Sequence, residues 1–505
     1  MKILVANRGE IAVRVLRACR EMGVGSVAVY SECDRTAPHV RMADHAVELG
    51  PGPPGESYLH IERVLAAATA AEATAVHPGY GFLAENPTFA RAVVDAGLTF
   101  IGPDADVIET MGGKTAARRA AIDAGVPVVP GTEALNSSLS EEELRARTDE
   151  VGYPLFIKAV AGGGGRGMRR VDTSDGVVSA VASARSEAET AFGDGSVYLE
   201  RLVEKARHIE VQVLGDTHGT VVPFVERECS IQRRHQKVIE ESPSVAVTLE
   251  VRRALADAAV ALSSAVSYVG AGTLEFLLDR DGQFYFLEMN TRLQVEHPVT
   301  EMVSGIDLVH WQIRIAQGER LTIDPERALT PVGHAIESRV YAEDPDRGFL
   351  PSPGLITSLR SPSGPGIRDD GGVEAGFEVP VFYDSMISKV IAWAPDREAA
   401  IIRMDRALRE YEIGGLITVI PALLWILEQE DFAAGEFDTG YLDRALTKRA
   451  GESFSVLSQR EEELAVVAAA LLAYFSSGER APEPPVVSTA SAWRQAARSE
   501  AVRER

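Results

Sequence analysis

The chain opens with MKILVANRGEIAVRVLRACREMGVGSVAVY (residues 1–30), and this segment sets the fold class. Residues 2–6 form a short apolar run typical of a buried strand, and residues 7–10 turn the chain. Apolar side chains then recur at helical spacing over 11–22, and a second strand-like run follows at 26–30. This alternation predicts a parallel α/β domain. The first turn lacks the pattern G-x-G-x-x-G, so it does not indicate a dinucleotide site.

Length and composition limit the classes of protein that remain. At roughly 150 residues per domain, 505 residues predict about three domains. The 74 acidic and 51 basic residues give a net charge of −23, which argues against a nucleic-acid-binding surface. We expect no membrane span, because no apolar run reaches roughly 18 residues, and we see no signal peptide. Three scattered cysteines, Cys19, Cys33 and Cys229, favour a cytoplasmic location.

The rest of the chain continues the mixed α/β pattern. The first unit closes near residues 100–103, and residues 104–130 have a helical pattern. Ser140 and Glu143 form a capping box before another helix. Strands are expected at 155–159, near 197–200 and near 208–214, and within an acidic β-rich segment at about 270–300. A third unit is expected from about 334 to 445.

A glycine-rich loop is the strongest local feature. It reads KAVAGGGGRGM over residues 158–168 and follows an apolar strand. Glycines leave the backbone free to approach a ligand, and successive amides can surround phosphate oxygens. Lys158 and Arg166 add positive charge, but no Gly-Lys-Ser/Thr follows, so this is not a Walker A loop. A flexible linker is the alternative; the strand before the loop favours phosphate binding.

Acidic residues on two neighbouring strands suggest a metal site. Glu275 lies in GTLEFL, and Glu288 and Asn290 lie in FYFLEMN. Glu288 and Asn290 are two residues apart, so they share a strand face. A carboxylate that ends a buried strand is costly unless it is paired or binds a metal. Three oxygen ligands of this kind suit Mg²⁺ or Mn²⁺, and a structural salt bridge is the alternative.

The next residues alternate in the same way. Arg292, Gln294 and Glu296 are expected on one face of a strand end, where they could hold a small planar oxyanion. Glu296 could then act as a general base. His297, which precedes a proline, is expected to be structural.

A charge run spans residues 226–237 (ERECSIQRRHQK). Segments of this kind are usually solvated faces, and that is our interpretation from the pattern alone. Cys229 has no evident activator and receives no nucleophilic role. A nucleic-acid-binding role for 233–237 is disfavoured by the overall charge and by the lack of interleaved aromatic residues.

Together these segments resemble biotin carboxylase, a member of the ATP-grasp superfamily. ANRGEIA at 6–12 looks like its N-terminal signature, and HPGYGFLAEN at 77–86 and the glycine loop match next. Further matches are ECSIQRRHQK at 228–237, EMNTRLQVEHP at 288–298, HAIESR at 334–339 and YDSMISK at 383–389. The resemblance covers about residues 1–445.

The resemblance implies an α/β protein of three domains and a tail. These are an N-terminal Rossmann-like domain (1–112), an ATP-grasp domain (113–330) with a mobile lid at about 130–203, and a C-terminal α+β domain (331–445). The tail at 446–505 is a possible partner-docking segment. Biotin would arrive on a separate biotin carboxyl carrier protein, because the chain shows no biotinyl-type lysine motif. A carboxyltransferase subunit would use the product, and a homodimer is expected.

The resemblance also implies roles for individual residues. Metal ions would be held by Glu275, Glu288 and Asn290. ATP phosphates would be contacted by Lys114, Lys158 and the lid residues Gly162, Gly163, Gly164, Gly165, Arg166, Gly167 and Met168. Adenine and ribose would be held by Glu200, Leu202, His208, Gln232, His235 and Leu277. Bicarbonate would be seated by Arg292, Gln294 and Val295, with Lys237 beside it.

The implied chemistry has two steps. Glu296 would deprotonate bicarbonate, which attacks the γ-phosphate of ATP to give carboxyphosphate. Arg339 would stabilise the biotin enolate that accepts the carboxyl group, and Tyr80 would contact biotin. The final acceptor would be an acyl-CoA or, alternatively, pyruvate or another 2-oxo acid. Two other readings are a different ATP-grasp ligase and a catalytically silent subunit, both disfavoured by the complete set of metal, base and arginine residues.

Overall fold

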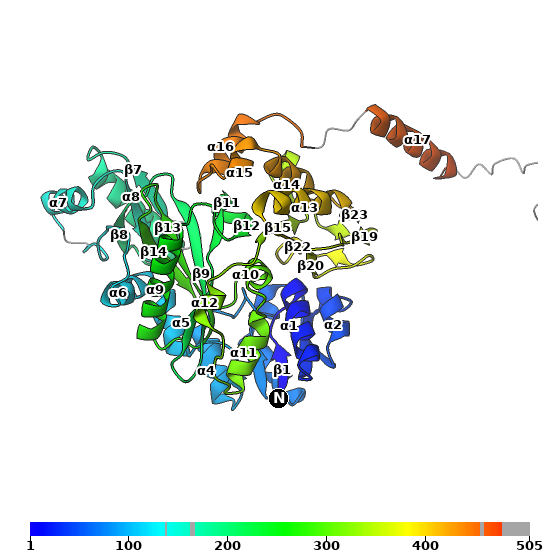
Figure 1. Cartoon of the computed structure of the whole chain (residues 1–505), viewed down its shortest axis with the longest axis horizontal. Coiled ribbons are helices and arrows are strands. Elements are labelled where there is room, and N and C mark those ends of the chain that lie inside the picture. Colours follow the sequence, from blue (N-terminus) through cyan, green and yellow to red (C-terminus); the bar gives the residue numbers. More distant parts are fainter. Residues whose placement is uncertain (137–138, 162–166, 455–458, 477–505) are drawn as a thin grey trace, which may run out of the picture. The chain divides into compact units, whose positions relative to one another are not determined.

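The structure is a computed structural model that describes residues 1–136, 139–161, 167–454 and 459–476 (Figure 1). The chain divides into two compact units, Met1–Glu452 and Ser453–Arg505, and each is described by itself.

The strand and helix predicted at the N-terminus are both present. β1 Lys2–Val5 is the middle strand of a five-stranded parallel sheet with the order β3-β2-β1-β4-β5. α1 Gly9–Glu21 packs its apolar side chains, including Ile11 and Val15, into a buried core with β1. The parallel α/β prediction is therefore confirmed. The other strands are β2 Gly25–Ser31, β3 His45–Gly50, β4 Ala75–His77 and β5 Thr99–Phe100.

Short helices accompany this sheet and lead out of it. The helical pattern expected at 104–130 is divided at Gly113 into two helices, α5 and α6. The helices are α2 Pro38–Met42, α3 Ile61–Ala70, α4 Pro87–Asp95, α5 Ala105–Gly112 and α6 Lys114–Asp123.

A nine-stranded antiparallel sheet forms the middle of the first unit. Its order is β14-β13-β9-β11-β12-β15-β22-β20, with β10 paired to β9. The strands are β9 Arg207–Gly215, β10 Val221–Pro223, β11 Arg227–Arg233, β12 Gln236–Ser242, β13 Gly270–Leu278, β14 Phe284–Asn290, β15 His334–Tyr341, β20 Ile367–Gly371 and β22 Met386–Ala394. The strands predicted within 208–214 and 270–300 are thus confirmed. Strands far apart in sequence share one sheet, which brings their polar side chains together.

Helices and short strand pairs complete this unit. α10 packs on β12, β15 and β22, and α13 packs on β15 and β22. The helices are α9 Leu249–Ala265, α10 His297–Ser304, α11 Leu308–Ala316, α12 Pro325–Ala328, α13 Arg397–Glu410, α14 Ile420–Leu427, α15 Glu430–Ala434 and α16 Tyr441–Lys448. The short pairs are β16 Glu343–Asp344 with β17 Leu350–Pro351, β18 Gly354–Leu355 with β21 Glu378–Val379, and β19 Ser358–Arg360 with β23 Glu412–Gly414.

A small antiparallel sheet carries the glycine loop. It has the order β7-β6-β8, with β6 Leu155–Ala159, β7 Met168–Val171 and β8 Val197–Arg201, and α7 Glu141–Val151 and α8 Val177–Phe192 pack on it. The capping box of Ser140 and Glu143 is confirmed at the start of α7. Gly167 has a φ of +75°, and a Cβ there would lie 2.9 Å from the Ala159 Cβ. A side chain at this position would therefore strain the end of the loop.

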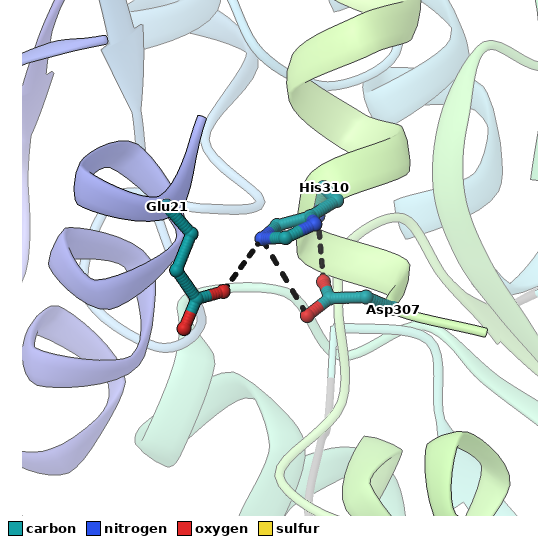
Figure 2. Close-up of side chains that lie close together, drawn as sticks. All are labelled: Glu21, Asp307 and His310. Atoms are coloured by element: carbon teal, nitrogen blue, oxygen red, sulfur yellow. Dashed lines mark hydrogen bonds and ion pairs between the residues drawn. The ribbon is translucent and has the colours of Figure 1, made fainter. Parts of the chain in front are cut away.

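Polar contacts join α1 to α11 (Figure 2). His310 Nε2 lies 3.0 Å from Glu21 Oε2 and 3.8 Å from Asp307 Oδ2. Arg14, also on α1, lies 2.7 Å from Asp307 Oδ2. Asp307 additionally caps α11 by accepting the His310 backbone N–H. These contacts hold the N-terminal sheet and its first helix against the helices that follow β14.

The second unit contains α17 Gln459–Ser476. The described side chains of this helix are exposed, including Leu464, Val467, Leu471 and Phe475. None of the helices in the described ranges combines the length and hydropathy that a bilayer crossing requires.

Candidate active site

Three polar side chains lie on one face of β9. His208, Glu210 and Gln212 alternate with the buried apolar residues of the same strand. His208 Nε2 lies 3.1 Å from Glu210 Oε1 and 3.1 Å from Glu275 Oε2. Burial alone would lower the pKa of His208, but the two carboxylates raise it to about 9. The imidazole is therefore protonated at neutral pH and supplies positive charge to this face.

Lys237, on β12, lies among three buried carboxylates. Its Nζ lies 3.0 Å from Glu275 Oε1 and 2.7 Å from Glu296 Oε1, and it also pairs with Glu210. Burial opposes the charged ammonium, but the three carboxylates outweigh burial and raise the pKa of Lys237 well above its ordinary value. One ammonium thus joins β9, β12 and β13 to the start of α10.

Glu275 and Glu288 are direct cross-strand partners on β13 and β14. Asn290, two residues along β14, donates from Nδ2 to Glu275 Oε1 over 2.8 Å. Glu288 is exposed, and among the described residues no lysine or arginine forms an ion pair with it. Two carboxylates and an amide, with one carboxylate open to solvent, fit the oxygen ligands of Mg²⁺ or Mn²⁺.

Glu296 occupies the N-cap position of α10 and is fully buried. Its two carboxylate oxygens are separately held, Oε1 by Lys237 at 2.7 Å and Oε2 by Arg339 at 2.9 Å. Burial and Glu210 would raise the pKa of Glu296, but the neighbouring cations lower it below its usual value. The carboxylate is therefore ionised and fixed in direction. Arg339 is oriented in turn by Glu240, whose Oε1 accepts from Arg339 Nε over 2.6 Å.

The segment between β14 and α10 is not the strand end that the alternation predicted. β14 ends at Asn290 and α10 begins at His297, with Pro298 in its first turn, so residues 291–296 form an irregular connection. Arg292 nevertheless meets Gln294, since its Nη1 donates to Gln294 Oε1 over 2.9 Å. It also donates from Nη2 to Asn290 Oδ1 over 3.1 Å and pairs with Glu85 at 2.8 Å. His297 is buried, and its Nδ1 lies 2.8 Å from the Gln294 carbonyl oxygen, as expected for a structural histidine.

Lys389 links the connection to the N-terminal domain. Its Nζ donates to the Val295 carbonyl over 2.8 Å, lies 3.2 Å from Glu10 Oε2 and lies 5.6 Å from the centre of the Tyr80 ring. Tyr80, Val295 and α1 are thereby held close to one buried ammonium.

We predict that Glu10 makes stability fall with rising pH. Burial raises its pKa from 4.5 to about 7, so the folded chain keeps a proton that the unfolded chain loses. The unfolding free energy of the wild type, relative to Glu10→Gln, should therefore decrease between pH 5 and pH 8, by on the order of 3 kcal/mol. Urea unfolding at several pH values measures this slope. The same comparison with Glu142→Gln, at an exposed position of α7, should show none.

The residues predicted to contact ATP phosphates lie around the small sheet. Lys158 on β6 forms a buried ion pair with Glu200 on β8, and Met168 is its register partner on β7. Lys114 begins α6, and burial together with the charge of Lys158 lowers its pKa. Gly162, Gly163, Gly164, Gly165 and Arg166 lie outside the described residues.

The remaining predicted contacts are distributed over β8, β11 and β13. Leu202 follows β8 and donates its N–H to the Pro154 carbonyl. Gln232, on β11, donates to the Cys229 carbonyl over 2.8 Å, and Leu277 is the register partner of His208. His235 lies at the exposed turn between β11 and β12 with a φ of +65°. These placements leave the roles of the four residues as predictions.

The interpretation of residues 226–237 as a solvated face is wrong. Residues 226–232 are buried, because β11 lies inside the sheet with β9 on one side and β12 on the other. Only the hairpin tip at 234–236 is exposed. Buried charge here is balanced by partners on other elements, such as Arg207 on β9, 3.2 Å from Glu228, and Arg252 on α9, 2.6 Å from Glu226. Cys229 is buried and burial raises its pKa, which agrees with the absence of a nucleophilic role.

Several buried ionisable side chains of this site were missed from the sequence. Glu210, Arg227, Glu240 and Glu337 are all within the network or beside it. The polar positions of β9 did carry a signal, since His208, Glu210 and Gln212 recur at every second residue between apolar side chains. No local signal marks the others, because their partners come from distant strands.

Three protein-family models match the sequence of this chain. The model of the biotin carboxylase N-terminal domain matches residues 1–108, and that of the biotin carboxylase C-terminal domain matches 337–444. Between them, the ATP-binding domain of the carbamoyl-phosphate synthase L chain matches 113–324. A biotin carboxylase of Nostoc sp. is 51% identical over 441 residues, which are 87% of this chain and 98% of that protein. The chain belongs to the biotin carboxylase family. It is an ATP-dependent ligase, as the family resemblance predicted.

Two further relatives bear on the wider assembly. A pyruvate carboxylase subunit of Methanothermobacter thermautotrophicus is 52% identical over 88% of this chain and 89% of its own length. The biotin carboxylase domain dimer of Hydrogenobacter thermophilus 2-oxoglutarate carboxylase was solved with MgADP, ADP and bicarbonate. It superposes with a TM-score of 0.84 at 47% identity and covers 90% of this chain and 99% of that one.

Proposed function

We propose that this biotin carboxylase carboxylates biotin on a separate carrier protein, as the first half-reaction of an acyl-CoA carboxylase. The observation that carries the proposal is the fixed, ionised Glu296, held between Lys237 and Arg339 beside the acidic pair Glu275 and Glu288. The similar identity to a pyruvate carboxylase subunit favours a second candidate, the same half-reaction in a two-subunit 2-oxo acid carboxylase.

The first step needs bicarbonate, ATP and a divalent cation. Glu275, Glu288 and Asn290 would hold Mg²⁺ or Mn²⁺, as their oxygen atoms and the exposed position of Glu288 allow. The cation, when bound, neutralises charge on the transferring phosphoryl group. The relative from Hydrogenobacter thermophilus, solved with MgADP and bicarbonate, supports this cofactor set.

Bicarbonate would lie against Arg292, Gln294 and the Val295 backbone. The guanidinium matches a planar oxyanion through two parallel hydrogen bonds. Glu296 accepts the bicarbonate proton, and a bicarbonate oxygen attacks the γ-phosphorus, so that ADP leaves and carboxyphosphate forms. Lys237 stabilises the negative charge that gathers around this transfer.

The second step uses the residues on the other side of Glu296. Carboxyphosphate separates into CO₂ and phosphate, and the phosphate takes the N1′ proton of biotin. The resulting enolate attacks CO₂ at carbon. Arg339 would stabilise this enolate, and Tyr80 would contact the biotin ring. Arg339 is suited to this because its guanidinium is fixed on two sides: Glu240 Oε1 contacts Nε and Nη2, and Nη2 also donates to Glu296.

The nucleotide would lie between the small sheet and the large one. Lys114, Lys158 and the loop from Gly162 to Met168 would contact its phosphates. Glu200, Leu202, His208, Gln232, His235 and Leu277 would hold adenine and ribose. The proposed domains end at residues 112, 330 and 445. Residues 130–203 would form a lid that excludes water from carboxyphosphate.

ADP release tests the proposed function. The purified chain should release ADP from MgATP in a bicarbonate-dependent reaction, and free biotin should increase the rate. Without a bicarbonate response, the proposal fails and a different ATP-grasp ligase or a silent subunit takes its place. A response that biotin leaves unchanged would move the acceptor away from biotin.

The assembly around the enzyme is also proposed. A biotin carboxyl carrier protein and a carboxyltransferase subunit would be its partners, and residues 446–505 are a possible docking segment. A homodimer is supported by the dimer of the Hydrogenobacter thermophilus domain. A cytoplasmic location is supported by Cys19, Cys33 and Cys229, which lie in the described residues and are unpaired.

A further inference from the structure

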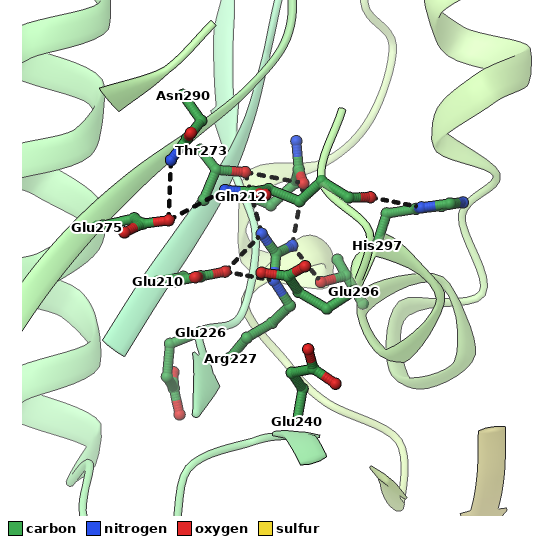
Figure 3. A network of polar contacts seen from close by, with 12 residues as sticks. Glu210, Gln212, Glu226, Arg227, Glu240, Thr273, Glu275, Asn290, Glu296 and His297 are labelled. Carbon is green, nitrogen blue, oxygen red and sulfur yellow. Dashed lines mark hydrogen bonds and ion pairs between the residues drawn. The ribbon is translucent and has the colours of Figure 1, made fainter. Parts of the chain in front are cut away.

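Arg227 is the largest fully buried side chain of the described residues, and it lies in the middle of the polar network that Figure 3 shows. It projects from β11 among four neighbours from three other elements. Nε and Nη2 both contact Glu210 Oε2 at 3.1 Å. Nη1 donates to Gln212 Oε1 and to Thr300 Oγ1, and Nη2 donates to Thr273 Oγ1, each over 3.0 Å. Four of the five N–H donors of the guanidinium thus form hydrogen bonds, and Nη2 also lies within ion-pair distance of Glu210.

The partners of Arg227 belong to the two halves of the proposed reaction centre. Thr273 lies on β13, two residues before Glu275, so the two side chains share a strand face. Thr300 lies on α10, four residues after Glu296 and thus one helical turn away. The Arg227 guanidinium consequently connects β13, which carries Glu275, to α10, which begins directly after the proposed base Glu296.

The ion pairs of Arg227 also connect it to the proposed reaction centre. Arg227 and Lys237 both pair with Glu210, so that carboxylate lies between two cations. The charge of Arg227 also contributes to the lowered pKa of Glu296, although the two side chains are not hydrogen-bonded to each other. A lysine could supply this charge, but its single ammonium could not reach four acceptors in fixed directions.

Stability alone is a weak reason for such an arrangement. Buried ion pairs are often no more stabilising than well-packed apolar side chains of similar volume. A planar five-donor fork instead defines the relative position of the groups that it contacts. The position of α10 relative to β13 sets the distance between Glu296 and Glu275.

We infer that Arg227 is a positioning residue, which sets the catalytic base on α10 at a fixed place relative to the metal-binding strands through Thr300 and Thr273. The inference rests on the proposed function, because it assigns Glu296 and Glu275 the roles given there. In the proposed mechanism, Arg227 contacts neither the substrates nor the metal ion.

The test removes one acceptor at a time. Thr300→Val keeps the shape of the side chain and deletes the acceptor for Nη1, and Thr273→Val deletes the acceptor for Nη2. Ser304→Ala is the matched control, because Ser304 lies on the same helix and its buried hydroxyl donates to the Thr300 carbonyl over 2.7 Å without contacting Arg227. Each variant is compared with wild type for thermal unfolding, for the KM of ATP, and for kcat of bicarbonate-dependent ADP release.

We expect Thr300→Val to lower kcat about tenfold, because small displacements of reacting groups are costly in rate. The KM for ATP should stay unchanged, and the unfolding temperature should shift no more than in Ser304→Ala. Thr300→Ser, which restores the hydroxyl, should recover the rate. Arg227→Lys should lower kcat further. If that variant does not fold, Thr300→Val and Thr273→Val still test whether Arg227 is a positioning residue.

Two results would count against the inference. If Thr300→Val and Thr273→Val both keep kcat within twofold of Ser304→Ala, Arg227 is a packing element only. If the rate loss follows the loss of folded protein and disappears when rates are normalised to it, the role is stability. Failure of the proposed function would look different, because the wild type itself would then show no bicarbonate-dependent ADP release.

Discussion

Glu296→Gln should lower bicarbonate-dependent ADP release by about 10²- to 10⁴-fold, the usual contribution of a positioned general base. Glutamine keeps the shape of the side chain, and its amide oxygen can still accept a hydrogen bond from Lys237 or Arg339. It cannot accept the bicarbonate proton. Initial rates at saturating ATP and bicarbonate measure the effect, and competition with a fluorescent nucleotide should show unchanged ATP binding.

Glu337→Gln is the matched control for this substitution. Glu337 is fully buried on β15, two residues before Arg339, and neither of its carboxyl oxygens has a hydrogen-bond partner among the described residues. Burial raises its pKa well above the usual value and so favours the neutral form, which glutamine resembles closely. This variant should therefore keep most of its activity. Equal losses in Glu296→Gln and Glu337→Gln would remove the base assignment.

The local part of this site could be predicted from the sequence. The opening strand and helix followed from apolar spacing alone, because β1 and α1 bury the residues that the pattern selected. The pairing of Glu275 with Glu288 also followed from local sequence, since β13 and β14 are consecutive strands. Patterns of this kind are sufficient where the partner lies on the next strand along the chain.

The rest could not be predicted because it depends on strand order. The carboxylates around Lys237 lie 27, 38 and 59 residues away in sequence. Residues 226–232 have the composition of a surface, yet β11 lies between β9 and β12, where each charge finds a partner. At Arg292, Gln294 and Glu296 the alternation suggested a strand, but α10 begins directly afterwards with Pro298 in its first turn.

Lys237→Met should destabilise the fold by about 3–5 kcal/mol at pH 8, the usual cost of removing one partner from a buried ion pair. Methionine has a similar length, so the loss is electrostatic rather than a cavity. Glu210, Glu275 and Glu296 would then lose the ammonium that they share. Bicarbonate-dependent ADP release should fall strongly as well, since the ammonium that we propose to face the transferring phosphoryl group would be gone. Urea unfolding measures the stability, and Lys448→Met, at an exposed position of α16, is the control.

The pH dependence separates electrostatics from packing in this variant. Without the ammonium, burial and mutual repulsion raise the folded-state pKa values of the three carboxyls, so the folded variant takes up protons that the unfolded chain takes up only at lower pH. The difference from wild type should therefore shrink as the pH falls from 8 toward 5.5. Glu210→Gln in the Lys237→Met background should also recover part of the loss, because Glu210 is fully buried and pairs with Lys237 and Arg227. A destabilisation that is the same at both pH values, and that Glu210→Gln makes worse, would show that Lys237 contributes by packing and that the carboxylates are balanced by other groups.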